Sequence, residues 1–244
     1  MSTEINTKEN IHWRTKQLNN EILAVNPEMC PERARFVTES YRETEAEPMI
    51  VRRAKAIARV LEKMTVFLQK DQLIAGNQAS SLRAAPLFPE TEAEYLESEI
   101  DLFEKREQDR LIVTPEVRRE LLEEILPYWK GKTIQERALA AMPEEVRETV
   151  LLEDQIFSVG IHLTGSIGHV LVDYDEVLSR GFEGIKEEVL RRMESLDLAD
   201  PDEGPKYDFY RAELILCDAI MEWALRLAGE AERAAKEEKD PRWK

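Results

Sequence analysis

Signals for the start of a helix recur along this chain, and they constrain its fold class more than any other feature. Proline lacks an N–H and fits the first turn of a helix, where the N–H groups have no partner within the helix. Five apolar-periodic stretches begin with such a proline or with a capping threonine: ERARFVTESYRE after Pro31, MIVRRAKAIARVLEKM after Pro48, RRELLEEIL after Thr114-Pro115-Glu116, RALAAM after Thr133 with Glu136, and EEVRETVLLE after Pro143. We therefore expect a mainly α fold.

The stretch 48–64 shows the helical period most clearly. Its apolar residues recur at three- and four-residue steps and are expected to share one face: Ile50, Ala54, Ile57, Leu61 and Met64. Two other stretches, 65–77 and 168–174, carry alternating and β-branched residues flanked by Gly and Asp. They predict a few short strands that decorate the helical body.

Charge and hydropathy exclude several classes of protein. The 244 residues include 34 basic and 50 acidic side chains, for a net charge of −16. Such a surface argues against nucleic acid or an anionic membrane as the main partner. The first residues contain no apolar signal-peptide core, and no apolar run is long enough to span a bilayer. We expect a cytoplasmic protein.

The end of the chain carries an unusually apolar helix. A Pro/Asp/Gly-rich linker at 196–206 separates an expected helical body, 1–195, from a long helix at 207–239. Between Phe209 and Ala228 the polar positions fall mostly on one narrow stripe, formed by Arg211, Asp218, Glu222 and Arg226. A helix that is apolar around the rest of its circumference is normally buried on most sides. We expect the apolar stripe to be more exposed in this chain than in a larger protein that covers it, and this stripe is Leu216, Ile220, Trp223 and Leu227.

The three histidines differ in what surrounds them. Glu9 and His12 make a single Glu-x-x-His step, and metal-binding bundles use this step in pairs, so we expect His12 at the surface and no metal site. His162 and His169 lie in 157–174 with three glycines and several hydroxyl side chains. This segment fits a pocket wall, where glycine lets the backbone approach a ligand, and it fits equally a turn that holds hydrogen-bonded histidines.

No common nucleophile or phosphate-binding motif is present. Cys30 and Cys217 are 187 positions apart with no histidine placed near them by sequence, so both are expected to be reduced thiols. GSIGH at 165–169 lacks the glycine spacing of nucleotide-binding loops.

Four separated blocks of the chain resemble one family. They are ERARFVTESYRETEAEPMIVRRAKAIARVLEKM (32–64), DQLIAGNQASSLRAAPLFPE (71–90), PYWKGKT (127–133) and GHVLVDYDEVLSRGFEGI (168–185). In this order they resemble the N-terminal region of glycyl radical enzymes of the pyruvate formate-lyase family, in the glycerol-dehydratase-like branch. The resemblance implies a large α/β barrel wrapped by helices, of which this chain supplies the N-terminal helical part.

The resemblance also implies a chemistry of anaerobic metabolism. Members of this lyase and acyltransferase family carry a cysteine on a central loop and a radical-storing glycine in an RVxGY-like context, and neither matches Cys30, Cys217 or any glycine of this chain. The chain is therefore expected to be an N-terminal fragment that is inactive alone. The glycyl radical of a complete relative is installed by an S-adenosylmethionine-dependent activase. The implied partners are the remainder of the enzyme, the activase, a small-molecule substrate and, when complete, a second copy.

Within the GHVLVDY block the resemblance assigns His169 to the substrate's hydroxyl groups. Ile161 stands where dehydratases of glycerol have a polar residue, and His162 and Thr164 also depart from their pattern. The expected substrate is therefore less polar than glycerol, with diol dehydration, aryl-acid decarboxylation and C–N or C–S cleavage all open. The alternative to a fragment is a free-standing helical interaction subunit that pairs with a separately encoded remainder.

Overall fold

The computed structural model describes residues 7–70, 72–150 and 171–239, with side chains described within 13–70, 72–148 and 171–239. Most of these residues are helical. The α-helices are α1 (Thr7–Ala24), α2 (Glu32–Glu43), α3 (Met49–Lys63), α4 (Pro89–Glu99), α5 (Pro115–Glu120), α6 (Leu126–Trp129), α7 (Ile134–Ala141), α8 (Glu144–Val150), α10 (Tyr174–Glu194) and α11 (Gly204–Glu237). The expectation of a mainly α fold is confirmed.

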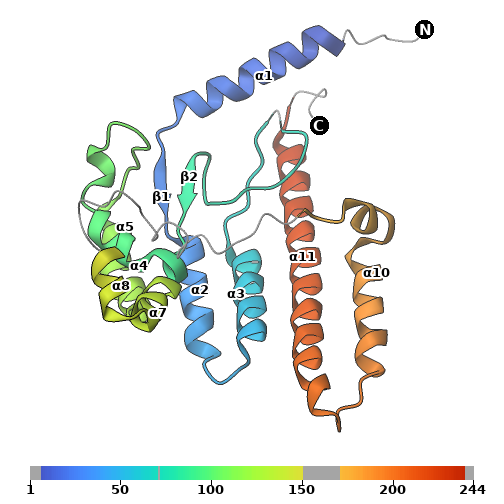
Figure 1. Cartoon of the computed structure of the whole chain (residues 1–244). Coiled ribbons are helices and arrows are strands. Elements are labelled where there is room, and N and C mark those ends of the chain that lie inside the picture. Colours follow the sequence, from blue (N-terminus) through green and yellow to red (C-terminus); the bar gives the residue numbers. More distant parts are fainter. Residues whose placement is uncertain (1–6, 71, 151–170, 240–244) are drawn as a thin grey trace.

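Four helices form a layer in the order α2, α3, α11, α10 (Figure 1). α2 and α3 form one helical hairpin, and α10 and α11 form a second. α3 and α11 make the most extensive contact between any two elements described. α11 has 34 residues and so a length of about 51 Å. The shorter helices α4 to α8 gather on the other side of α2 (Figure 1).

The main hydrophobic core lies between α2 and this group of shorter helices. Leu121 is fully buried there, and the ring of Trp129 lies 5.1 Å from the ring of Tyr41. Trp129 donates its Nε1–H to Thr38 Oγ1 at 2.8 Å, and Thr38 Oγ1 donates to the Ala34 carbonyl at 2.7 Å. The polar atoms that enter this core with the large indole ring are thereby paired.

Several helix starts agree with the predicted signals. Thr114 accepts a hydrogen bond from the Val117 N–H at 3.3 Å, and Thr133 with Glu136 forms the expected capping box. The predicted helix RRELLEEIL is not uniform, because Leu121–Ile125 is a π-helical turn. Pro127 lies two residues after the end of this turn and has no N–H to continue the regular ladder, which accounts for the wider hydrogen-bond step.

The strand prediction at 65–77 is wrong in position, and residues 168–170 of the other predicted strand lie outside the described residues. The strands are β1 (Glu28–Cys30) and β2 (Ala84–Pro86), which pair in parallel. The described residues of 65–77 form no strand, because side chains bond this backbone instead: Asn77 Nδ2 donates to the carbonyls of Thr65 at 2.6 Å and Ala79 at 2.8 Å. In the predicted strand 168–174, residues 171–173 are not extended into a ladder, and Tyr174 begins α10.

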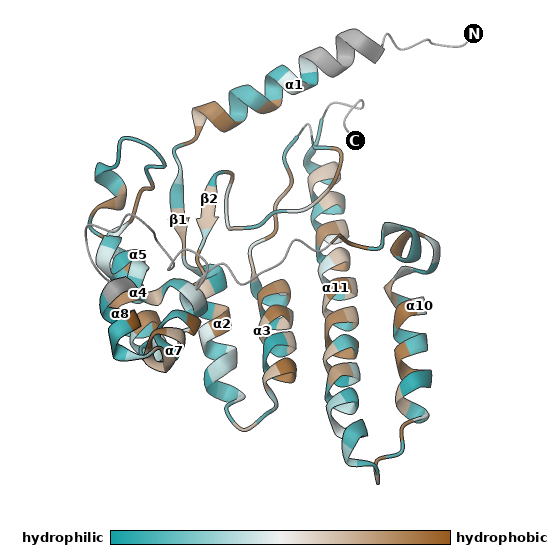
Figure 2. Ribbon diagram, viewed as in Figure 1, coloured by the Kyte–Doolittle hydropathy of each residue, from teal (hydrophilic) through white to brown (hydrophobic). Residues whose placement is uncertain are grey.

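The predicted face of α3 is only partly buried. Ala54 and Met64 are buried, but Ile50 and Ile57 are 39% and 47% exposed. The buried side of α3 instead includes Val51 and Ala56. These residues are buried because α3 packs between α2 and α11, and no described helix covers the side that carries the two isoleucines. Figure 2 shows hydrophobic residues along α3 and α11.

α11 begins earlier than expected, at Gly204 inside the predicted linker 196–206, directly after a 3₁₀ turn at Pro201–Glu203. Within the apolar stripe Leu227 is buried, and Leu216, Ile220 and Trp223 are half-buried. That the stripe is more exposed here than in a larger protein stays a prediction. The segment before β2 covers this end of the helix, since a Cβ placed on Gly76 would lie 3.7 Å from the Trp223 ring. No helix of the described residues is long and apolar enough to cross a membrane.

Candidate functional site

The residues predicted to line a substrate pocket lie outside the part of the chain that the structure describes. These are Ile161, His162, Thr164 and His169, all within 151–170. The side chain of His12 is likewise outside the described side chains, although its backbone belongs to α1. The structure does describe the C-terminal flank of this segment, from Leu171 into α10. This flank determines how the predicted segment joins the fold.

Asp173 fixes the start of α10. Its carboxylate accepts a hydrogen bond from the Glu176 N–H at 3.1 Å, as expected of an N-cap residue. The Tyr174 N–H donates to the Val172 carbonyl at 2.9 Å and closes a tight turn before the helix. His169 is therefore four residues ahead of a capped helix start in the sequence.

Glycine allows a sharp bend about two turns later. Gly181 has φ = +64° and ψ = 176°, a conformation that side-chain-bearing residues rarely adopt, and it divides α10 into a short first part and a longer second part. A Cβ at Gly181 would meet nothing within 4 Å, so the requirement for glycine comes from the backbone and not from crowding.

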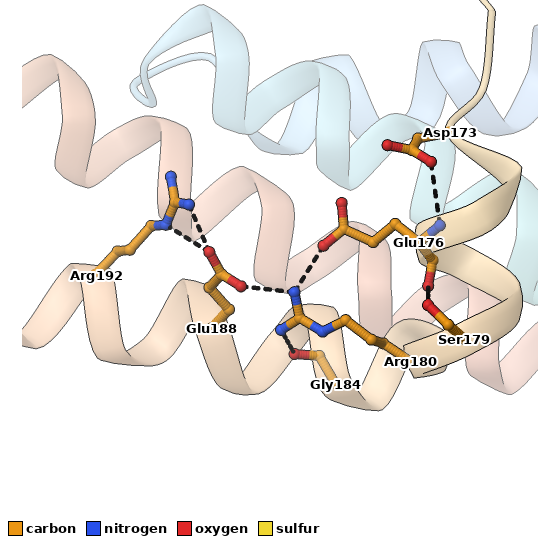
Figure 3. Close-up of polar contacts among 7 residues, drawn as sticks. All are labelled: Asp173, Glu176, Ser179, Arg180, Gly184, Glu188 and Arg192. Atoms are coloured by element: carbon orange, nitrogen blue, oxygen red, sulfur yellow. Dashed lines mark hydrogen bonds and ion pairs between the residues drawn. The ribbon is translucent and has the colours of Figure 1, made fainter.

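Arg180 connects the two parts of α10 across this bend (Figure 3). Its Nη1 donates to Glu176 Oε1 at 2.7 Å on the first part and to Glu188 Oε2 at 2.6 Å on the second, while Nη2 donates to the Gly184 carbonyl at 2.8 Å. Glu188 also accepts from Arg192, with Nε at 3.0 Å. Hydrogen bonds from Arg180 and Arg192 lower the pKa of Glu188, so this network is ionised at neutral pH.

The described residues offer little catalytic chemistry of their own. They contain no group of three or more His, Cys, Asp or Glu side chains suited to a metal ion. Cys217 is buried, and burial raises the pKa of its thiol, which disfavours the reactive thiolate. Cys30 is also buried, and Ser80 Oγ donates to its Sγ at 3.2 Å. Cys30 ends β1 and directly precedes Pro31, where α2 starts.

The polar stripe of α11 contacts neighbouring helices, a role that sequence reasoning missed. Arg226 donates to the Leu61 carbonyl and, at 2.6 Å, to the Met64 carbonyl, at the C-terminal end of α3 where carbonyls lack helical partners. Lys186 of α10 donates to Asp218 of α11 at 2.5 Å. The sequence did contain a signal for this role, because these charged residues stand alone on an otherwise apolar helix.

Comparisons with known proteins match nearly the whole chain to one family. A family model described as "Pyruvate formate lyase-like" matches residues 4–244. An isethionate sulfite-lyase of Desulfovibrio desulfuricans is 36% identical over 237 residues, which cover 94% of this chain and 28% of that protein.

Solved structures give the same result. The B12-independent glycerol dehydratase from Clostridium butyricum in its glycerol-bound form matches with a TM-score of 0.87 and 35% identity, covering 94% of this chain and 29% of that one. A structure described as 1,2-propanediol dehydration in Roseburia inulinivorans matches with a TM-score of 0.86 and 34% identity, covering 93% and 28%. The chain thus spans just over a quarter of the length of these relatives.

Proposed function

The chain belongs to the pyruvate formate lyase-like family, whose matched relatives are glycyl radical lyases and dehydratases, and we propose that it is the N-terminal part of such an enzyme. One observation carries this proposal. The matches cover 94% of this chain but only 28% or 29% of the length of the relatives. In this proposal the four-helix layer belongs to the helical outer part of a larger α/β barrel.

The chain does not act alone in this proposal. The family's catalytic cysteine loop and radical glycine have no counterpart in the sequence, and the two cysteines that are present are buried and part of β1 and α11. A remainder of the enzyme supplies both elements. The radical is installed there by an S-adenosylmethionine-dependent activase, and the assembled enzyme is a cytoplasmic homodimer of anaerobic metabolism.

Exposed apolar residues on the helical layer support a covering remainder. Ile50 and Ile57 recur at a seven-residue step on α3, and Phe209 on α11 is 45% exposed. Covering a large apolar side chain contributes about 1.5–3 kcal/mol, so several such side chains favour association with further chain.

The substrate site of the assembled enzyme includes the segment around His169. In the proposal His169 forms a hydrogen bond with the substrate, and Ile161, His162 and Thr164 line the same pocket. The capped start of α10 and the Arg180 network support this role, because they hold the C-terminal side of the segment in place. The matched relatives suggest a first panel of substrates: isethionate, glycerol and 1,2-propanediol, with a substrate less polar than glycerol preferred because of Ile161.

The test is anaerobic incubation of the purified chain with an activase, S-adenosylmethionine, reductant and each substrate of the panel. A full-length relative serves as the positive control. We expect neither turnover nor a glycine-centred doublet in electron paramagnetic resonance from the chain alone. Turnover together with such a doublet would overturn the proposal that the chain is incomplete. A chain that instead binds a separately encoded remainder without affecting its turnover would identify the alternative, an interaction subunit.

A further inference from the structure

A cleft of about 670 Å³ lies on the side of the fold that carries β1, away from the α10 network. It is lined by Asn26, Pro27, Arg83, Arg106, Asp109, Arg110, Leu111 and Ile112. These residues come from three parts of the sequence: the connection from α1 to β1, the start of β2, and the segment after the 3₁₀ turn Phe103–Lys105. Nothing in the proposed function uses this cleft.

Backbone hydrogen bonds hold the three segments together. The Met29 N–H donates to the Ile112 carbonyl and the Ile112 N–H to the Pro27 carbonyl, both at 2.9 Å. Glu28 also forms parallel bridges to Ile112 on one side and to Ala84 on the other. The cleft is therefore built where three parallel segments begin, and its lining residues are fixed by long-range pairing and not by one flexible loop.

Positive charge dominates the lining, although the chain as a whole carries a net charge of −16. Asp109 is the one carboxylate among the lining residues, against three guanidinium groups. Arg106 is paired with Glu99 at 2.8 Å. Among the described side chains and backbone, Arg83 donates only through Nη1, to the Val25 carbonyl at 2.9 Å and the Ile22 carbonyl at 3.3 Å, and its Nη2 and Nε have no partner there. The Arg110 side chain has no hydrogen bond or ion pair to any residue within 13–70, 72–148 or 171–239.

Backbone strain is concentrated in the same cleft. Arg83 has φ = +67° and Asp109 has φ = +52°, and across the described ranges these are the two non-glycine residues with positive φ. Left-handed backbone is unfavourable for side-chain-bearing residues and tends to occur where a site is held in a required geometry. Both strained residues line the cleft, and neither is a glycine, which would adopt this backbone without strain.

We propose that this cleft binds a small organic oxyanion of the phosphate-monoester class. Guanidinium groups recognise phosphate oxygens through paired, charge-assisted N–H donors, and Arg110 together with the unused donors of Arg83 supplies them. The volume exceeds what a bare phosphate needs and lies in the range of small-molecule sites. Pro27, Leu111 and Ile112 give the lining an apolar part that fits the organic portion of the ligand.

The test uses the 244-residue chain and phenyl phosphate as the probe, with binding measured by isothermal titration calorimetry. We expect saturable binding at one site, weakened at least tenfold in Arg110→Gln and weakened further as NaCl is raised from about 50 to 200 mM, because salt screens the charges. Arg191→Gln, on α10 and outside the cleft, is the matched control and should bind like the wild type. The Arg110 side chain is exposed and makes no hydrogen bond or ion pair within the described part of the chain, so its variant should keep the wild-type melting temperature.

Phenol, which lacks the charge, and benzoate, which carries a carboxylate, test whether the cleft recognises the phosphate group. The proposal requires phenyl phosphate to bind more tightly than either. Equal binding of phenol would show that charge is not recognised, and tighter binding of benzoate would assign the cleft to carboxylates instead. Absence of saturable binding, or wild-type affinity in Arg110→Gln, would overturn the proposed site.

Discussion

Replacing Glu94 with Gln should stabilise the chain near neutral pH and leave its stability at low pH unchanged. Glu94 lies on α4 and faces Thr133, the fully buried N-cap residue of α7. Thr133 Oγ1 is 2.8 Å from Glu94 Oε1 and 3.1 Å from Glu136 Oε2, and it accepts the Glu136 N–H at 3.1 Å. A hydroxyl has one proton to donate. It cannot donate to both carboxylates at once.

The three contacts are all satisfied when Glu94 is protonated. The Glu94 O–H then donates to Thr133 Oγ1, which in turn donates to Glu136. Burial raises the pKa of Glu94, with the neighbouring Glu136 acting in the same direction. For Glu136 burial acts against ionisation, but hydrogen bonds from the Gly131 and Thr133 N–H groups and from Glu94 outweigh it and lower the pKa. The pair is therefore expected to hold one proton over part of the acidic range.

The sign of the pH dependence comes from the raised pKa of Glu94. The stabilisation by its protonated form is complete below the ordinary glutamate pKa, and it is lost as pH rises through the higher pKa of the folded chain. Above that pH one half-buried acceptor faces another without a proton between them, which costs about 1 kcal/mol. A glutamine amide donates at any pH and avoids this loss. For a chain of this size each kcal/mol corresponds to about 2–4 °C in melting temperature.

The assay is urea unfolding of the wild type and Glu94→Gln at several pH values between about 4 and 8, a range that spans the ordinary glutamate pKa and neutral pH. Glu97→Gln on the exposed side of α4 is the control, because it removes the same charge without touching Thr133. We expect the advantage of Glu94→Gln over the control to grow with pH. Parallel stability profiles for the wild type and Glu94→Gln would refute the shared proton.

Three further predictions test other parts of the account. Leu121→Ala should destabilise the chain by about 2–5 kcal/mol in urea unfolding, because this fully buried side chain lies in the main core and leaves a cavity; a loss below about 1 kcal/mol would place it outside the cooperative unit. Gly181→Ala should lower the free energy of unfolding by about 1–3 kcal/mol, because the residue has a positive φ. Gly229→Ala, in regular helix, should raise it by about 1 kcal/mol. Equal effects of the two substitutions would contradict the bend at Gly181. In an assembled, active enzyme His169→Gln should lower kcat/KM about 5- to 150-fold with an unchanged melting temperature and radical yield. A lower melting temperature with intact kinetics would make His169 a structural residue.

Local signals in the sequence predicted the helices well. The starts at Thr114 and Thr133 depend on a side chain that bonds an N–H three residues away, so a short stretch of sequence contains the whole interaction. Such signals predicted the starts of α2, α3, α5, α7 and α8 but not those of α4 and α10.

Features that depend on distant partners were not predictable. β1 and β2 are three residues each and pair across more than fifty positions, and their short sequences carry no alternation to detect. The apolar alternation of 65–77 was misleading because Asn77 and Gln72 bond the backbone of that segment. The role of Arg226 depends on the end of α3 lying beside α11, which only the tertiary fold provides. The predicted pocket around His169 stays a prediction.

The central claim is that this chain provides the helical N-terminal part of a glycyl radical enzyme and works only with the remainder. The most direct measurement is anaerobic turnover by the chain mixed with a separately produced remainder that carries the cysteine loop and the radical glycine, after activation. We expect substrate turnover from the mixture and none from either polypeptide alone, with the two co-eluting as one complex. Turnover by either polypeptide alone at the rate of the mixture, or an active remainder that does not bind this chain, would contradict the claim.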